Sequence, residues 1–307
     1  MFEDSRRVIL EKYLKQAILE GLTKKLACWV LQGKNKFEFH AGASGPETEY
    51  DLASLTKIFC TTLLTAQAIA EEKLKLDEQP WPNWPGVTVE HILNHRAGLP
   101  PWVEIQTLQD VFKIKPVEKP NQKTVYSDMG FIALGALLEE RLGESLDKLC
   151  ETSGMHFRKF SPLEPGVQRE IELVDDPRCR ALGGVAGHSG LFGTLRGVCE
   201  ESLFFLKCLK SPQTQLEYTI KAFAEYPGPR GLGFDKTTQE GSVRGVLSEK
   251  SIGHLGYTGT SVWIDPAQDA IYILLMHRLK DIQTEKIMNF RREFHRLATQ
   301  VWNSKKN

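Results

Sequence analysis

The sequence predicts an α+β protein in which one antiparallel sheet, covered by helices from both chain ends, adjoins an all-helical lobe. Short β-rich runs occur near the two ends of the 307-residue chain, and amphipathic helix patterns fill its middle and both termini. Such helices bury the apolar face of a sheet. We therefore expect a single unit over 1–307, with a sheet lobe at about 1–53 and 230–307 and a helical lobe at about 54–229.

The start of the chain contains a helix pattern and a hairpin. Apolar residues recur at helical spacing over 6–22, opposite a charged face. Two β-rich runs, 26–31 and 36–40, flank a short glycine-containing turn, which is typical of a β-hairpin. A long helix is expected over 54–73, entered from the strand-like residues 50–52. A strand-to-helix junction is therefore predicted near residue 53.

Helix patterns fill the middle, and strands return near the end. Thr88 is a typical N-cap for a short helix through Asn94, and Gly143 is a typical C-cap for a helix over 131–142. Another helical run ends at Leu209. Three β-rich runs and a closing amphipathic helix complete the chain, at 251–256, 260–264, 270–276 and 282–303.

Charge and composition exclude several classes of function. Lys+Arg and Asp+Glu each total 39, so the formal net charge is zero and no basic stripe is available for nucleic acid. The N-terminus lacks the basic start and unbroken apolar core of a secretory signal, and the longest apolar stretch, 58–70, is too short to span a bilayer. We therefore expect a cytoplasmic protein with no membrane insertion and no nucleic-acid partner.

The six cysteines indicate neither a redox motif nor a zinc site. They show no CxxC spacing and no nearby histidine partner. We expect free, mostly buried thiols in a reducing compartment. The positions are Cys28, Cys60, Cys150, Cys179, Cys199 and Cys208.

The first candidate for chemistry is Ser54, three residues before Lys57. On a helix these side chains are neighbours one turn apart, so the amine can draw the proton from the hydroxyl. The same spacing occurs at Ser145 and Lys148, within a polar stretch that indicates a solvated surface. Ser54 instead lies between a strand-like run and a long apolar helix. Taken alone, the motif is also consistent with an ordinary helix N-cap.

Two further segments contain candidate groups. Tyr126 lies two residues before Asp128, and a neighbouring lysine would stabilise its phenolate as a general base for Ser54. The glycine-rich segment 253–260 permits a substrate to approach the backbone closely. Its Tyr257 N–H is a candidate partner of the Ser54 N–H in an oxyanion hole. A half-buried turn tyrosine and a simple glycine turn remain the alternatives.

In this order the three segments resemble the motif set of the serine β-lactamase and penicillin-binding-protein superfamily, in its class C-like and esterase branch. Ser54–Lys57 resembles the family's Ser-x-x-Lys, Tyr126–Asp128 its Tyr-x-Asn, and His254–Gly256 its Lys-Thr-Gly or His-Thr-Gly strand. The likeness extends from about residue 24 to about 278. Further family-like stretches lie at 91–100, 181–194 and 231–235.

The resemblance implies the β-lactamase/transpeptidase-like fold, with the active site between the sheet and the helical lobe. It implies that Ser54 is the nucleophile and that Lys57 and Tyr126 handle its proton. The N–H groups of Ser54 and Tyr257 would form the oxyanion hole. No metal and no cofactor are implied.

Asp128, His254 and Gly256 fall at substrate-binding positions, and this stretch departs twice from the family pattern. A carboxylate only accepts hydrogen bonds, so we expect Asp128, in place of the frequent Asn, to pair with Lys57. His254 is mostly neutral at pH 7, and Leu255 offers no donor where a threonine would. We therefore expect weak recognition of the β-lactam carboxylate, and an enzyme that is not primarily a β-lactamase.

These residues favour a serine hydrolase that forms an acyl-enzyme on Ser54. The substrate would be an ester or an amide, including a cell-wall (muropeptide) fragment in the cytoplasm. A true β-lactamase or a D-Ala carboxypeptidase is an alternative enzyme, and a non-catalytic binder or sensor of peptidoglycan-derived ligands is an alternative of another class. His95 and His188 are interpreted as structural hydrogen-bonding residues. The sequence leaves open the oligomeric state, and whether Lys57 or Tyr126 takes the serine proton.

Overall fold

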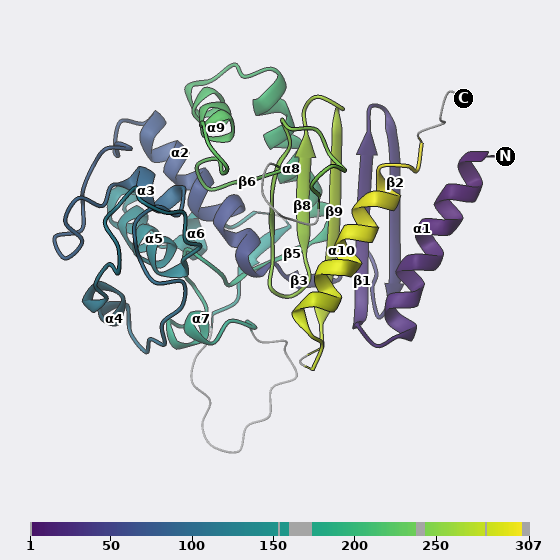
Figure 1. The fold of residues 1–307 in the computed structure, drawn as a ribbon, viewed down its shortest axis with the longest axis horizontal. Coiled ribbons are helices and arrows are strands. Elements are labelled where there is room, and N and C mark those ends of the chain that lie inside the picture. Colours follow the sequence, from purple (N-terminus) through teal and green to yellow (C-terminus); the bar gives the residue numbers. More distant parts are fainter. Residues whose placement is uncertain (1, 153, 160–173, 238–242, 280, 303–307) are drawn as a thin grey trace.

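The computed structural model describes residues 2–152, 154–159, 174–237, 243–279 and 281–302. Its largest sheet has six antiparallel strands in the order β2-β1-β9-β8-β7-β6 (Figure 1). The two chain ends complete one sheet, because β1 pairs with β9 as the sequence predicts. The strands are β1 (Thr23–Gln32), β2 (Asn35–Gly42), β6 (Asp235–Lys236), β7 (Ile252–Leu255), β8 (Ser261–Asp265) and β9 (Ala270–Arg278).

The strand β1 is buried on both faces and separates two hydrophobic cores. Successive side chains of a strand point to opposite faces. Trp29 and Leu31 therefore join the core on the side of the helical lobe, whereas Cys28 and Val30 join the core beneath the terminal helices. Each fully buried side chain of this size contributes about 1.5–3 kcal/mol to folding.

Helices cover both faces of the six-stranded sheet (Figure 1). The helices α1 and α10 pack against each other and against one face, and α8 contacts β1, β8 and β9 from the other. The sequence analysis assigned α8 to the helical lobe, but it lies between that lobe and the sheet. The bounds are Phe2–Leu19 for α1, Leu195–Lys210 for α8 and Thr284–Ala298 for α10. Residue 303, included in the expected closing helix, lies outside the described residues.

The remaining helices gather at one side of the sheet, where the helical lobe is expected (Figure 1). Local signals in this lobe are confirmed. The Thr88 side chain accepts the N–H of His91 and caps α3, and α5 ends at Gly143 in the left-handed conformation. The bounds are α2 (Leu63–Ala70), α3 (Val89–Leu93), α4 (Leu108–Lys113), α5 (Asp128–Leu142), α6 (Leu146–Leu149), α7 (Pro177–Ala181) and α9 (Gln215–Glu225).

Two features of this lobe were not predicted. A second sheet with the order β3-β5-β4 lies within it, formed by Glu49–Asp51, Leu191–Thr194 and Met155–Phe157. Strands this short leave almost no alternation in the sequence. The long helix expected over 54–73 is instead a 3₁₀ turn at Ala53–Leu55, a π-helix at Lys57–Thr62 and then α2.

Cys60 and Cys150 form a disulfide that joins the π-helix to the end of α6. The prediction of six free thiols is therefore wrong for this pair, whereas the other four cysteines are free and buried. The partners lie 90 positions apart in the sequence, and only the packing of the lobe brings them together. The disulfide also removes the cysteine argument for a reducing compartment.

The helical stretch Ala53–Ala70 has the length and composition to cross a membrane, although the sequence analysis considered 58–70 too short. In the structure, 72% of this stretch is buried inside the fold. That burial is typical of a core helix, and Ser54 and Lys57 are part of it.

Candidate active site

A cleft of about 840 Å³ lies between the start of the 53–70 helical stretch, the start of α5, the α7 helix and the end of β7. It brings together residues that are far apart in the sequence. Lys57 does not line the cleft, because it lies fully buried beneath the cleft floor. All the other residues predicted for the site line the cleft, namely Ser54, Tyr126, Asp128, His254, Gly256 and Tyr257.

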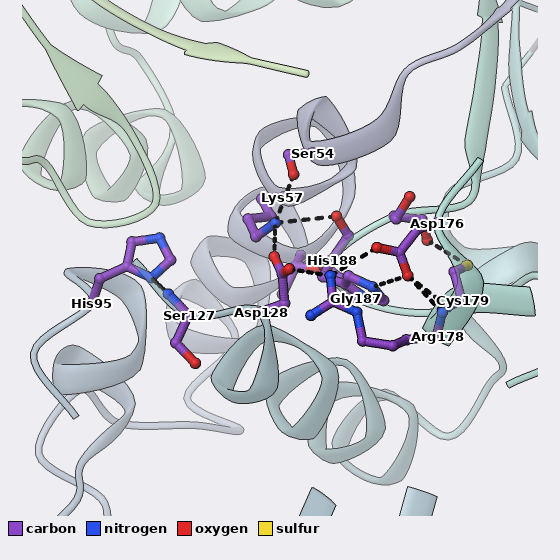
Figure 2. A network of polar contacts seen from close by, with 12 residues as sticks. Ser54, Lys57, His95, Ser127, Asp128, Asp176, Arg178, Cys179, Gly187 and His188 are labelled. Atoms are coloured by element: carbon purple, nitrogen blue, oxygen red, sulfur yellow. Dashed lines mark hydrogen bonds and ion pairs between the residues drawn. The ribbon is translucent and has the colours of Figure 1, made fainter. Parts of the chain in front are cut away.

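The Lys57 ammonium points toward Ser54 on one side and Asp128 on the other (Figure 2). Its Nζ donates to Ser54 Oγ at 3.0 Å, to Asp128 Oδ1 at 2.7 Å and to the His188 carbonyl at 3.2 Å. These three bonds use all three ammonium protons. The predicted pairing of Asp128 with Lys57 is confirmed.

Lys57 and Asp128 each stabilise the charged form of the other. Burial alone lowers the pKa of Lys57, but the Asp128 carboxylate and the Tyr126 oxygen outweigh it, so the Lys57 pKa lies above its ordinary value. Burial raises the pKa of Asp128, yet Lys57, His188 and Arg178 together lower it to about 2. At neutral pH the pair is therefore an ammonium and a carboxylate.

The Tyr126 ring lies against the Lys57 ammonium, with 4.9 Å between Lys57 Nζ and the ring centroid. Tyr126 is 38% exposed, and its ring packs at a tilt against His95 with 4.5 Å between the ring centroids. The sequence analysis expected Lys57 to favour the Tyr126 phenolate. Lys57 does act in that direction, but desolvation by burial is larger and Asp128 opposes the lysine, so the Tyr126 pKa is raised. The expectation of a ready phenolate is wrong for this arrangement.

A second layer of ionic contacts holds Asp128 from behind (Figure 2). Arg178 Nη2 lies 2.5 Å from Asp128 Oδ2 and 2.8 Å from Asp176 Oδ2. Asp176 also caps α7 and lies 3.1 Å from His188 Nε2, and its pKa is lowered because His188 and Arg178 outweigh its burial. Sequence reasoning missed Arg178, although Asp176 before Pro177 is a typical helix start.

The two predicted histidines contact the site without contacting Ser54. His95 Nδ1 accepts the N–H of Ser127 at 3.1 Å, next to Tyr126. His188 contributes its carbonyl oxygen to Lys57 and its ring to Asp176. Both contacts agree with the structural roles that the sequence analysis assigned.

Gly256 and Tyr257 form the opposite wall, where backbone groups matter more than side chains. A Cβ on Gly256 would lie 2.0 Å from Thr260 Oγ1 and 2.8 Å from the Leu52 carbonyl, so glycine lets this turn approach Ser54. Among the hydrogen bonds between described residues, the N–H groups of Ser54 and Tyr257 donate none. Both groups are therefore available to a ligand oxygen in the cleft.

Comparison with known proteins agrees with this geometry. The Beta-lactamase family model matches residues 23–296. The chain belongs to the β-lactamase family. It is 24% identical over 301 aligned positions to a protein of Escherichia coli (strain K12) named "Putative D-alanyl-D-alanine carboxypeptidase", covering 75% of this chain and 69% of that protein.

Two solved structures show that the β-lactamase fold extends over nearly the whole chain. A class C β-lactamase has a TM-score of 0.71 and 14% identity, covering 100% of this chain and 98% of that one. EstCE1, described as a hydrolase with promiscuous acyltransferase activity, has a TM-score of 0.70 and 17% identity, covering 96% of this chain and 98% of that one. The chain thus has the fold of the β-lactamase-family serine hydrolases.

The β7 wall differs from the usual β-lactamase pattern in the charge of its side chains. Burial, the largest effect, lowers the pKa of His254 to about 4, so its ring is neutral as predicted. Two arginines that sequence reasoning missed line the cleft near this wall, Arg278 from β9 and Arg291 from α10. Burial and Arg278 lower the pKa of Arg291 to about 10, so Arg291 stays charged at neutral pH. The expectation of weak recognition of a β-lactam carboxylate stays a prediction.

Proposed function

We propose that this protein is a serine hydrolase that forms an acyl-enzyme on Ser54 and cleaves an ester or an amide. The observation that carries the proposal is the hydrogen bond from the buried Lys57 ammonium to Ser54 Oγ at 3.0 Å, at the floor of the cleft. An amine held against a hydroxyl is the typical arrangement of an activated nucleophile. Tyr126 lines the same cleft, with its ring centroid 4.9 Å from Lys57 Nζ.

The proposed reaction has two halves. In the form of the enzyme in which the Lys57–Tyr126 pair has lost one proton, Ser54 Oγ attacks the substrate carbonyl and its proton passes to that free base. The oxyanion accepts hydrogen bonds from the N–H groups of Ser54 and Tyr257. The carbonyl–leaving-group bond then breaks, and the pair returns the proton to the leaving group. Water repeats these steps on the acyl-enzyme and frees Ser54. Lys57 and Tyr126 titrate as a unit, so the proton belongs to the pair.

We propose a substrate with a carboxylate, such as a cell-wall (muropeptide) peptide. Arg278 and Arg291 line the cleft near Tyr257, and their positive charge would attract a carboxylate. The name of the Escherichia coli relative points to a peptide ending in D-alanine for that protein. A simple ester remains the second candidate, because EstCE1 is described as a hydrolase with acyltransferase activity.

The raised pKa values of Lys57 and Tyr126 predict how kcat/KM depends on pH. Lys57 and Tyr126 are both protonated at pH 7, so the fraction of enzyme with a free base rises about tenfold per pH unit below their pKa values. We expect kcat/KM to rise between pH 7 and 10. Asp128→Asn removes the carboxylate that raises the Lys57 pKa, so the rise should shift to lower pH. A flat profile in the unsubstituted protein would contradict this role of the pair.

Intact-mass spectrometry tests the assignment of Ser54. The protein is mixed separately with a fluorophosphonate, p-nitrophenyl acetate and a penicillin, and a D-Ala-D-Ala peptide is assayed for D-alanine release. We expect one adduct that disappears in Ser54→Ala and persists in Ser145→Ala, the matched control at the second Ser-x-x-Lys. Steady product release would establish turnover. An adduct that never hydrolyses would favour the binder or sensor, and the absence of any adduct would overturn the proposal.

A further inference from the structure

Asp51 is a buried carboxylate whose two oxygens hold two different segments of the chain. It is the last residue of β3 and is fully buried. Its Oδ1 accepts the N–H of Ala53 at 2.8 Å, and its Oδ2 accepts the N–H of Asp175 at 2.7 Å. One bond therefore ends directly before Ser54, and the other ends directly before the α7 cap.

The bond to Ala53 holds a backbone that alanine adopts at a cost. Ala53 has φ 47°, in the left-handed region that favours glycine. The direction of the next N–H, that of Ser54, depends on this backbone. A residue that fixes Ala53 therefore also fixes one of the two proposed oxyanion donors.

The main chain of the same segment reaches the second proposed donor. Thr258 Oγ1 donates to the Asp51 carbonyl at 2.8 Å, and Thr260 Oγ1 donates to the Leu52 carbonyl at 3.4 Å. Both threonines lie just after Tyr257. The turn before Ser54 and the turn that carries Tyr257 are thus joined at Asp51 and Leu52.

The bond to Asp175 extends the same connection to the ionic layer. Asp175 precedes Asp176, which caps α7 and binds Arg178. Arg178 in turn binds Asp128, the partner of Lys57. Asp51 is thereby connected to the proposed oxyanion hole and to the ammonium that contacts Ser54.

We propose that Asp51 is a positioning residue that sets the Ser54 N–H against the Tyr257 N–H and anchors α7 to the turn before Ser54. This inference rests on the proposed function. Asp51 touches no substrate and acts through Ala53 and Asp175. Its removal should therefore slow acylation more than it weakens substrate binding.

The bonds from Asp51 to the Ala53 and Asp175 N–H groups, here called the Asp51 clamp, depend on the charge of Asp51 and are therefore sensitive to acid. Burial is the largest effect on Asp51, and together with the carboxylates of Asp175 and Asp176 it outweighs the two N–H bonds and raises the pKa of Asp51 to about 7. Asp51 in turn contributes to the raised pKa of the buried Cys179 thiol. Protonation places a hydrogen on an oxygen that must accept an N–H, so the clamp weakens below about pH 7.

The test compares Asp51→Asn with Asp265→Asn. Asp265 is the matched control, because it is fully buried and accepts the N–H groups of Ser248, Ala267 and Gln268 at 3.0–3.1 Å, outside the cleft. With p-nitrophenyl acetate we expect Asp51→Asn to lower kcat at least tenfold with KM within threefold, because an amide offers one acceptor oxygen for two N–H donors. Asp265→Asn should lower the melting temperature and leave kcat unchanged. Equal loss of kcat in both variants would overturn the proposal.

Two further measurements keep the proposal falsifiable. In the unsubstituted protein, the slope of log kcat/KM against pH should steepen from about 1 above pH 7 to about 2 below it, because two groups must then lose protons. A slope without a break near pH 7 contradicts the clamp even if Asp51→Asn fails to fold. Hydrogen exchange at 52–58 and 174–179 should accelerate in Asp51→Asn alone, and unchanged exchange overturns the clamp. Hydrogen exchange can be measured without catalytic activity, so it tests the role of Asp51 even if the protein proves inactive. The proposed function is tested separately, by the presence or absence of the Ser54 adduct.

Discussion

The two walls of the cleft have opposite chemical character. The helical wall places the charged groups of Lys57, Asp128 and Arg178 in one buried network behind Ser54. The β7 wall presents a neutral histidine, His254, and a glycine turn at Gly256. In the proposed mechanism, the first wall therefore handles the proton, and the second wall contributes backbone N–H groups and shape.

This difference explains why the departures from the family pattern at β7 leave the proposed mechanism intact. A neutral ring beside Tyr126 adds no charge to the Lys57–Tyr126 pair. In the proposed function, the cations for a substrate carboxylate are Arg278 and Arg291, which line the cleft from other elements. The helical wall has no such substitute for Lys57 among the described residues that line the cleft near Ser54.

Substitution of Lys57 should therefore have the largest effect. Lys57→Met removes the ammonium, while Asp128 keeps its bond to Arg178, so the fold should survive. We expect kcat/KM for p-nitrophenyl acetate to fall about 10²–10⁴-fold, the usual contribution of a positioned proton-transfer group. Lys148→Met is the control, because Lys148 belongs to the second Ser-x-x-Lys and is exposed. Equal activity of the two variants would show that the helical wall does not carry the chemistry.

Substitution of Gly256 tests the backbone role of the β7 wall. A Cβ there would lie 2.0 Å from Thr260 Oγ1 and would push the turn away from Leu52. Because displacement of one oxyanion donor typically costs about 10²–10³ in kcat, we expect Gly256→Ala to lose about 10²-fold. Gly45→Ala is the control, since nothing lies within 4 Å of its added Cβ. Unchanged kcat in Gly256→Ala would remove Tyr257 from the oxyanion hole.

The sequence predicted those features whose causes are local. The β1–β2 hairpin, the Thr88 cap and the Gly143 stop each depend on residues a few positions apart. The motif order also predicted which side chains line the cleft. For the hairpin, the cap and the stop, both partners lie within one short window, whereas the cleft residues were predicted through the family resemblance of their motifs.

The sequence could not predict contacts that form only when distant segments pack. Arg178 reaches Asp128 across 50 positions, and Arg291 Nη2 reaches the Gly256 carbonyl from α10. The raised pKa of Tyr126 is similar, because its largest cause is burial, which depends on the whole fold. Charged side chains on a helix pattern indicate a solvated face, so buried arginines of this kind are missed.

The neutrality of the β7 wall predicts an acid-dependent stability. The His254 pKa is lowered to about 4 in the fold against about 6.5 when unfolded, so the unfolded chain binds more protons between these values. Stability is therefore present above about pH 6.5 and is lost as pH falls toward 4, by about 2 kcal/mol at pH 5. Between pH 8 and 5, the free energy of unfolding of His254→Gln should therefore fall by about 2 kcal/mol less than that of the unsubstituted protein, as measured by urea unfolding. Identical losses would mean that His254 is already charged in the fold.

The smallest expected effect is that of a substitution at Ala53, directly before Ser54, where the two walls of the cleft meet. Gly adopts positive φ without a Cβ penalty, but it also has more freedom to lose on folding, so Ala53→Gly should change stability by less than about 0.5 kcal/mol. Ala136→Gly, within the regular helix α5, should cost about 1 kcal/mol. Chemical unfolding of both variants measures this difference. Equal losses of stability in the two variants would show that the backbone at Ala53 is unstrained. Asp51 would then not be needed to hold Ala53 in an unfavourable conformation.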